Sequence, residues 1–481
     1  MEIKLSSGKV IPIEMHKVRI VQKTSLPPVR QRLQAIEEAG YNSFLLRSRD
    51  IFIDMLTDSG TNAMSDNQLA AMMVSDDAYA GGESYYKLGA AVKDILGFKY
   101  YVPAHQGRAA EHLLTKIFIK PGQVIPMNYH FTTTKAHFHL AGGTVLELYT
   151  DEALKTESDH PFKGNMDIDK LRAVIAKEGA KNVSFVRMEA TTNLIGGQPF
   201  SMANLKEVRK VATEHGIPVI IDCSLISENA YFIKRREPGY ADVSVEQIVR
   251  EMMDQADLIY LSGRKSTCVR GGLLATNNPK YFDQLKAWLP LYEGFITYGG
   301  MSSKEIEAMA VGLREMVDYD VASSSADLIK YFVDEMVKRK IPAVTPPGGL
   351  AGHVDAMRFL PNVPQAGYTA GALVAALYLV SGVRGMERGT ISMDRDAQGN
   401  DCFADVELCR LAVPRRVYSV SHMDYVVDRL AWLLEHRDLV GGLEFYEEPP
   451  VLRFFTGKLK ALKDWGTKLA AAFETDFGPN S

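Results

Sequence analysis

Apolar and polar positions alternate in short blocks between about residue 95 and residue 280. Continuous apolar runs at 217–222 (IPVIID) and 256–261 (ADLIYL) are typical of strands buried on both faces of a parallel sheet. Between such runs, the stretch at 203–215 (ANLKEVRKVATEH) has the spacing of an amphipathic helix, and Gly216 suits a left-handed helix end. Further elements are expected as strands at 98–103 and 182–190 and a helix at 108–119. This alternation predicts an α/β fold with a mostly parallel sheet, where ligands bind beyond the carboxyl ends of the strands.

The alternation loosens after about residue 317. Helices are expected at 29–39, 325–339 and 369–381 and from near His422, with a strand in VELCRLAV. A chain of 481 residues usually forms more than one domain. We therefore predict a large domain at 57–317 and a smaller α+β domain at 318–481, with residues 1–56 forming an arm and part of the small domain.

Composition narrows the class of protein. The net charge of −4 with mixed signs gives no surface for nucleic acid or membrane, and four cysteines without metal-ligand spacing argue against zinc. The N-terminal segment lacks the apolar core of a signal peptide, and the longest apolar stretch, 371–384, is too short to span a bilayer. We expect a cytoplasmic protein with a small-molecule partner.

Polar residues stand where predicted strands end. Gln106, Gly107 and Arg108 lie between a strand and a helix, where a helix N-terminus can bind phosphate, although glycine there also simply permits a turn. Asp222 ends a buried strand, where a carboxylate needs a partner; it is either a cap or ion pair, or the partner of a protonated ring nitrogen. Phe131 precedes three threonines and offers a flat apolar face beside hydroxyls, unless the segment is an ordinary strand.

Two adjacent cations follow the next strand, in LSGRKSTCVRGG. Arg264 and Lys265 could both lie in a solvated turn. Together with the features above, however, their position matches the order that holds pyridoxal phosphate (PLP): a phosphate cradle, a buried aspartate, then a lysine. Asp222 would keep the pyridine nitrogen protonated, and Lys265 would bind the cofactor covalently and move protons at the substrate Cα.

Long phrases of the chain resemble those of a known family. FLLRSRDIFIDMLTDSGTNAMSD, DDAYAGGESYY, NYHFTTTKAHFH and RLAVPRRVYSVSHMDYV resemble the β-eliminating lyases, the family of tyrosine phenol-lyase and tryptophanase. The phrases TDSGTNAMSD, MERG and LRFFT are closer to the tyrosine phenol-lyase branch. The resemblance covers nearly the whole chain and implies a fold type I (aspartate aminotransferase-like) PLP enzyme, a homotetramer built from dimers that share active sites.

The resemblance also implies roles for individual residues. Lys265 would carry PLP, Phe131 would stack on its ring, Asn193 would contact the ring hydroxyl and Asp222 the ring nitrogen. The phosphate would be held by Gln106, Gly107, Arg108 and Ser262.

On the substrate side, Tyr79 from a neighbouring subunit would be the general acid. Arg410 would bind the substrate carboxylate with its planar fork. The phenolic oxygen would contact Thr132 and Arg388, and Phe454 and Phe455 would line the aromatic pocket.

The chain departs from the family in and beside this site. Arg264-Lys265-Ser266 stands where the family has two lysines and an acid, Leu225 replaces an arginine near the cofactor, and Phe295 replaces a methionine of the pocket. Loss of a cation at 225 should alter proton transfer at Cα. The expected reaction is β-elimination of tyrosine, or a close aromatic amino acid, to a phenol, pyruvate and ammonia.

Two alternatives remain open. One is a diverged member that catalyses β-replacement or transamination on a hydroxylated aromatic amino acid. The other is a cofactor-binding homologue without turnover, against which the intact Lys265, Tyr79, Arg388 and Arg410 argue.

A monovalent cation, which activates the family, is not expected here. The positions of its ligands match Gly60, Asp77 and Arg270, and a guanidinium cannot share a small oxygen cage with potassium. Arg270 would instead supply the positive charge and donate hydrogen bonds to Asp77 and the Gly60 carbonyl. In the alternative, Arg270 points to solvent and the site is simply lost.

Overall fold

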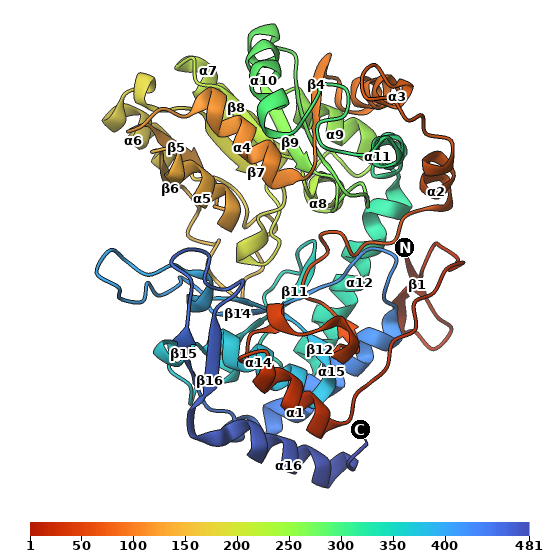
Figure 1. Cartoon of the computed structure of the whole chain (residues 1–481), viewed down its shortest axis with the longest axis vertical. Helices are drawn as coiled ribbons and strands as arrows, with labels where there is room; N and C mark the ends of the chain where they lie inside the picture. Colours follow the sequence, from red (N-terminus) through yellow and green to blue (C-terminus); the bar gives the residue numbers. More distant parts are fainter. Residues whose placement is uncertain (481) are drawn as a thin grey trace. The chain divides into compact units, whose positions relative to one another are not determined.

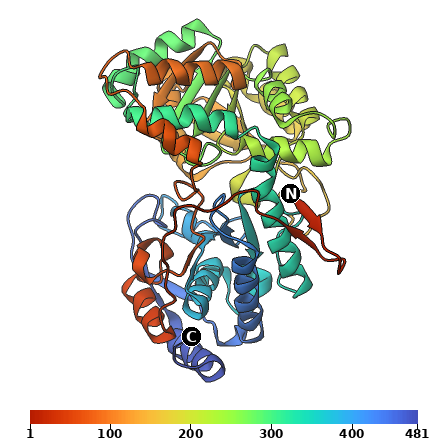
Figure 2. The same cartoon turned by 90° about the vertical axis from the view of Figure 1, so that its right-hand side faces the viewer.

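A computed structural model describes residues 1–480. The chain forms two compact units, each drawn in Figures 1 and 2. The large unit comprises residues 59–153 and 160–326. The small unit comprises residues 1–58 and 154–159 and the chain from 327 onward.

A seven-stranded sheet forms the centre of the large unit (Figure 1). β10 pairs antiparallel with both of its neighbours, and the remaining pairs are parallel. The predicted mostly parallel α/β fold is therefore confirmed. In spatial order the strands are β4 (Tyr100–Ala104), β10 (Gly272–Thr276), β9 (Leu258–Ser262), β8 (Val219–Asp222), β7 (Val186–Glu189), β5 (Val124–Met127) and β6 (Thr144–Glu147).

Helices bury both faces of this sheet. One face packs against α4 (Gly107–Phe118), α5 (Thr132–Leu140) and α10 (Pro279–Tyr292). The other packs against α3 (Glu83–Ala91), α6 (Ile168–Glu178), α7 (Met202–Glu214), α8 (Ile226–Arg236), α9 (Val245–Met253) and α11 (Ser303–Glu315). Successive strand residues alternate between the two cores, as Ile220 and Ile221 do, which explains why these strands are continuously apolar.

The small unit is built around a buried helix. All residues of α14 (Thr369–Ser381) are buried, and α1 (Val29–Glu38), α15 (Val420–Glu435) and α16 (Trp465–Phe477) pack around it. Beside α14 lies an antiparallel sheet in the order β11 (Ala351–Asp355), β14 (Leu408–Ala412) and β13 (Met386–Arg388). The N-terminal segment belongs to this unit, because β3 (Ile53–Asp54) pairs with β12 (Val383–Arg384).

The remaining elements connect these cores or lie at their edges. They are β1 (Glu2–Lys4), β2 (Val10–Pro12), α2 (Asp66–Met73), α12 (Tyr319–Lys338), α13 (Ala356–Phe359), β15 (Leu443–Glu447) and β16 (Lys458–Ala461). Two details differ from the sequence prediction: α12 begins at Tyr319 rather than near residue 325, and the threonines after Phe131 begin helix α5 rather than continue a strand. Across residues 1–480, no helix combines the length and apolar character needed to cross a membrane.

Candidate active site at the carboxyl ends of three strands

Three neighbouring strands of the large unit each end on a polar residue. β7 ends at Glu189, β8 at Asp222 and β9 at Ser262. The register pairs Glu189 with Asp222, and Asp222 with Tyr260. Because these strands are parallel, their carboxyl ends share one edge of the sheet, which is where ligands bind in such folds.

Lys265 lies in the turn that follows β9 at this edge. Its backbone N–H donates to the Ser262 carbonyl at 3.3 Å, and its ammonium nitrogen lies 5.0 Å from the centre of the Phe131 ring. Phe131 is the residue that precedes the first turn of α5. The structure thus brings together the lysine and the aromatic ring that the sequence singled out.

Hydrogen bonds from two sides hold the turn in place. The Asn62 side-chain amide donates to the carbonyls of Arg264 at 3.1 Å and Lys265 at 3.0 Å. The N–H and hydroxyl of Ser266 donate to the Ser224 carbonyl at 3.2 and 2.8 Å. The Lys265 backbone is therefore fixed before any ligand binds, as a precise site requires.

Arg264, the neighbouring cation, has different surroundings. Its carbonyl accepts the Gly60 N–H at 3.2 Å, and a Cβ added to Gly60 would lie 3.5 Å from its guanidinium. Burial lowers the pKa of Arg264, and the nearby charges of Arg270 and Arg108 lower it further. Of the two adjacent cations, Lys265 is the one placed beside Phe131.

The start of α4 meets the end of β9 closely. A Cβ added to Gly107, the first residue of α4, would lie 2.7 Å from the Ser262 Cβ, so only glycine allows this approach. No side chain caps this helix. The N–H groups at the start of a helix suit an anion, and Gln106, Arg108 and Ser262 flank this start.

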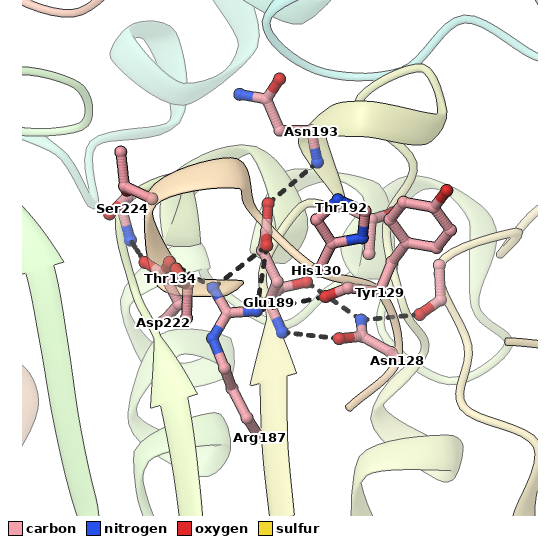
Figure 3. Close-up of polar contacts among 12 residues, drawn as sticks. Asn128, Tyr129, His130, Thr134, Arg187, Glu189, Thr192, Asn193, Asp222 and Ser224 are labelled. Atoms are coloured by element: carbon pink, nitrogen blue, oxygen red, sulfur yellow. Dashed lines mark hydrogen bonds and ion pairs between the residues drawn. The ribbon is translucent and has the colours of Figure 1, made fainter. Parts of the chain in front are cut away.

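A buried ionic cluster occupies the ends of β7 and β8 (Figure 3). The Arg187 guanidinium donates to Glu189 Oε2 at 3.1 Å and to Asp222 Oδ2 at 2.8 Å, and it donates to the Tyr260 hydroxyl at 2.8 Å. The second oxygen of Asp222 accepts the Ser224 N–H at 3.0 Å. Burial acts to lower the pKa of Arg187, but Tyr260, Glu189 and Asp222 outweigh it and raise that pKa.

Asn193 extends the cluster. Its backbone N–H donates to Glu189 Oε1 at 3.0 Å, and its side-chain amide is directed away from the carboxylate (Figure 3). Burial raises the pKa of Glu189, while Arg187 and Lys265 are among the neighbours that oppose this rise.

Arg187 and Glu189 were not singled out from the sequence. They lie in NVSFVRMEA, which predicts a buried strand. The available signal was the spacing: two opposite charges two residues apart point to the same face of a strand, where each needs a partner.

Glu111 of α4 is a third buried carboxyl near this edge. It accepts hydrogen bonds from the hydroxyls of Thr133 at 2.8 Å and Thr134 at 2.5 Å. Burial raises its pKa to about 7. Thr133 and Thr134 belong to α5. Thr132, which the sequence singled out, is half-buried and is the first residue of that helix.

Tyr79 lies on the surface of the large unit and is 75% exposed. Its ring stacks on Phe295 at 6.1 Å and lies 5.4 Å from Tyr298. A hydrogen bond to Tyr298 raises the pKa of the Tyr79 hydroxyl.

The predicted substrate arginines belong to the small unit, on adjacent strands. Arg388 ends β13, and Arg410 lies in β14 opposite Met386. Both arginines are buried, and Arg410 donates to the Leu56 carbonyl at 3.0 Å. Burial lowers the pKa of Arg410 to about 10; Asp58 opposes this shift and Arg388 adds to it.

The two predicted pocket phenylalanines adjoin each other in the same unit. The rings of Phe454 and Phe455 are 4.0 Å apart, and Phe44 packs edge-on against both. Phe454 is buried and Phe455 is half-buried.

The residues matched to the cation site lie in the large unit. Arg270 is exposed, and so is Asp77, whose carboxylate accepts a hydrogen bond from the Ser303 hydroxyl at 3.1 Å. Among residues 1–480 there is no group of three or more histidine, cysteine or acidic side chains arranged to hold a metal ion.

The chain is similar to known proteins over most of its length. A sequence model of the beta-eliminating lyases matches residues 54–429. Tyrosine phenol-lyase of Symbiobacterium thermophilum is 47% identical over 93% of this chain and 98% of its own length, and that of Clostridium tetani is 44% identical over the same shares. Among solved structures, serine palmitoyltransferase of Sphingomonas wittichii superposes with a TM-score of 0.57 at 13% identity, covering 81% of this chain and 88% of that one.

Proposed function

Since the chain belongs to the β-eliminating lyase family, we propose that it is a PLP-dependent carbon–carbon lyase that cleaves tyrosine, or a close aromatic amino acid, to a phenol, pyruvate and ammonia. The observation that carries this proposal is the position of Lys265. Its amine lies beside the Phe131 ring, at the edge where β8 ends in Asp222.

The residues at this edge fit PLP. The uncapped start of α4, closed against Ser262 by Gly107, suits a phosphate that Gln106 and Arg108 also contact. Phe131 would stack on the cofactor ring with its flat face. Asp222 would accept a hydrogen bond from the ring nitrogen, and the side-chain amide of Asn193 would contact the ring hydroxyl. When bound, the cofactor supplies an electron sink for the bonds at the substrate Cα.

The chain's own side chains then bind the substrate and move protons. Arg410 binds the substrate carboxylate, Arg388 and Thr132 bind the phenolic oxygen, and Phe454 and Phe455 line the aromatic pocket. The Lys265 amine removes the Cα proton. Tyr79 delivers a proton to the ring carbon of the departing phenol.

Tyr79 acts on the site of a neighbouring subunit. Its high exposure within a single chain supports this role, because a catalytic tyrosine usually lies inside a pocket. We propose a cytoplasmic homotetramer built from dimers that share their active sites.

The enzyme works without a monovalent cation. Arg270 occupies the position of one cation ligand, and the Arg264 guanidinium lies close to Gly60, so positive charge already surrounds this region. Activity and cofactor absorbance should be equal in potassium and tetramethylammonium buffers. A large, saturable activation on returning potassium would contradict this.

Product analysis tests the proposed reaction. The purified protein is incubated with tyrosine and a panel of other aromatic amino acids, and products are identified by mass spectrometry. Equal amounts of phenol and pyruvate from tyrosine, absent with Lys265→Ala, are the expected result. A replacement or keto-acid product would indicate another reaction at Cα or Cβ, and absence of any product would refute an enzymatic role for these substrates.

A further inference from the structure

Two buried carboxylates stand side by side at the candidate site. Glu189 and Asp222 are the last residues of adjacent parallel strands and are paired in register. Their residues are only 4% and 6% exposed. Two negative charges this close in a poorly solvated site cannot both persist without a cation, because one of them would take up a proton.

Arg187 is the cation that separates them. It precedes Glu189 by two residues on β7, so its side chain emerges on the same face of the sheet. Its guanidinium contacts both carboxylates at 2.8–3.1 Å. The Tyr260 hydroxyl and the Tyr129 carbonyl accept its remaining hydrogen bonds at 2.8 and 3.2 Å, which fix its plane.

The charges of this cluster leave one negative charge in excess. Arg187 neutralises one carboxylate, and Asp222 is further held by the Ser224 N–H on its other oxygen. An ionised, immobile carboxylate is what a protonated ring nitrogen requires as its partner. Glu189 Oε1 accepts the Asn193 N–H at 3.0 Å.

We propose that Arg187, balanced by Glu189, is a positioning residue that keeps Asp222 ionised and in place for the ring nitrogen of bound PLP. This inference rests on the proposed cofactor site. It assigns the pair a role in cofactor binding and not only in the stability of the sheet.

Loss of the Arg187 guanidinium should make PLP affinity depend on pH. Without the guanidinium, the two adjacent carboxylates would share one proton at low pH, and the ring nitrogen would lose its charged partner. Cofactor binding should then be weak at low pH and recover as pH rises. The other ionisable groups acting on the cluster are Tyr260, Glu111 and Lys265.

Three variants of the full chain separate charge balance from packing. Arg187→Met removes the cation at similar volume, and Arg187→Met/Glu189→Gln removes the cation and one carboxylate charge together. The matched control is Arg209→Met, because Arg209 pairs with Asp257 at 2.5 Å at the opposite, amino-terminal end of the same strands. The PLP dissociation constant of each apoprotein is measured by absorbance from about pH 6 to about pH 9, alongside the midpoint of urea unfolding.

Arg187→Met should bind PLP at least about tenfold more weakly near pH 6, with affinity recovering as pH rises, since one pKa unit changes the ionised fraction by about tenfold. The double variant should recover most of the affinity and lose the pH dependence. Arg209→Met should shift only the unfolding midpoint. Unchanged, pH-independent affinity in Arg187→Met would overturn the proposal, and so would a double variant as impaired as the single one.

If Arg187→Met does not fold, the PLP affinity of the double variant across the pH range tests the proposal by itself. It should fold and bind PLP with the flat pH profile of the parent, and a pH-dependent loss of affinity in it would refute the charge-balance role. Failure of the parent protein to bind PLP at all would instead refute the proposed cofactor site, so the two failures are distinguishable.

Discussion

Lys265 and Arg264 are adjacent cations with different tasks, and their surroundings explain the difference. The Lys265 amine faces an aromatic ring, and its charge lies close enough to act on Glu189. Arg264 lies beside Gly60, among other arginines. An amine can lose its proton and act as a nucleophile, whereas a guanidinium stays charged, so only Lys265 can carry the proposed chemistry.

Arg388 should determine the choice of substrate. Arg388→Ala should lower turnover of tyrosine by at least ~10²-fold. Without the guanidinium, the hydroxyl of the bound tyrosine would be buried without a hydrogen-bond partner. Elimination from amino acids with a simple leaving group on Cβ should persist. Steady-state kinetics with both substrate types measures this split.

Arg384→Ala is the matched control for Arg388→Ala. Arg384 belongs to the same unit and pairs with Asp54 at 2.5 Å. Its loss should affect stability and leave the ratio of the two activities unchanged. If Arg388→Ala cleaved tyrosine as well as the parent does, the phenol-recognition role would be wrong.

Glu111 should make stability depend on pH. Its pKa rises from 4.5 to about 7 on folding, so the folded protein binds this proton more tightly than the unfolded chain does. The stabilisation from that proton is present below about pH 4.5 and is lost as pH rises through 7. Glu111→Gln, which cannot ionise, should therefore gain about 2 kcal/mol relative to the parent between about pH 5 and about pH 8. Urea unfolding at both pH values measures the free energy of unfolding of the parent and of Glu111→Gln. An equal loss of stability in the two proteins as pH rises would contradict this prediction.

At the scale of elements, the site depends on how closely α4 approaches β9. Gly107→Ala would place a Cβ 2.7 Å from the Ser262 Cβ and push the helix start away from the strand end. We expect at least about a tenfold loss of PLP affinity, since misplaced donors lose their hydrogen bonds to the phosphate. Titration of the apoprotein with PLP measures it.

Gly239→Ala is the control for this substitution. Gly239 has φ +89° and open space around its Cβ position, so alanine there strains the backbone without touching the site. It should lower stability but not PLP affinity. Equal affinities for Gly107→Ala and the parent would show that the close approach is not needed for the cofactor.

The sequence was most informative where local pattern decides structure. The predicted helix at 369–381 coincides with α14, β8 lies within the predicted apolar run at 217–222, and β9 overlaps the run at 256–261 and extends one residue beyond it. Asp222 was identifiable because a carboxylate at the end of a continuous apolar run is buried, and a buried carboxylate is costly unless it has a partner.

What the pattern could not supply were pairings across strands. Arg187 looks like an ordinary strand residue until β7 and β8 pair and place it against Asp222. The helical start at Thr132 was also missed, since β-branched threonines favour strands and only the tertiary structure decides otherwise.

At the scale of the whole molecule, we expect residues of more than one chain in each active site. Tyr79→Phe and Lys265→Ala should each be inactive alone. Mixed by unfolding and refolding together, they should regain about a quarter of parental activity, because about half of the dimers are hybrids and each hybrid has one site with both residues intact.

Refolding each variant separately is the control for this mixing experiment. Recovered activity that appears only in the mixture would support sharing of Tyr79 between subunits. No recovery despite formation of mixed oligomers would place Tyr79 in the site of its own chain.

Reductive labelling can show whether PLP binds covalently to Lys265, the bond on which every proposed step depends. The protein loaded with PLP is reduced with borohydride, digested and mapped by mass spectrometry, with Lys265→Ala treated in parallel. We expect a pyridoxyl group on Lys265 in the parent and none at a specific position in the variant. A stoichiometric label on any other lysine would contradict it.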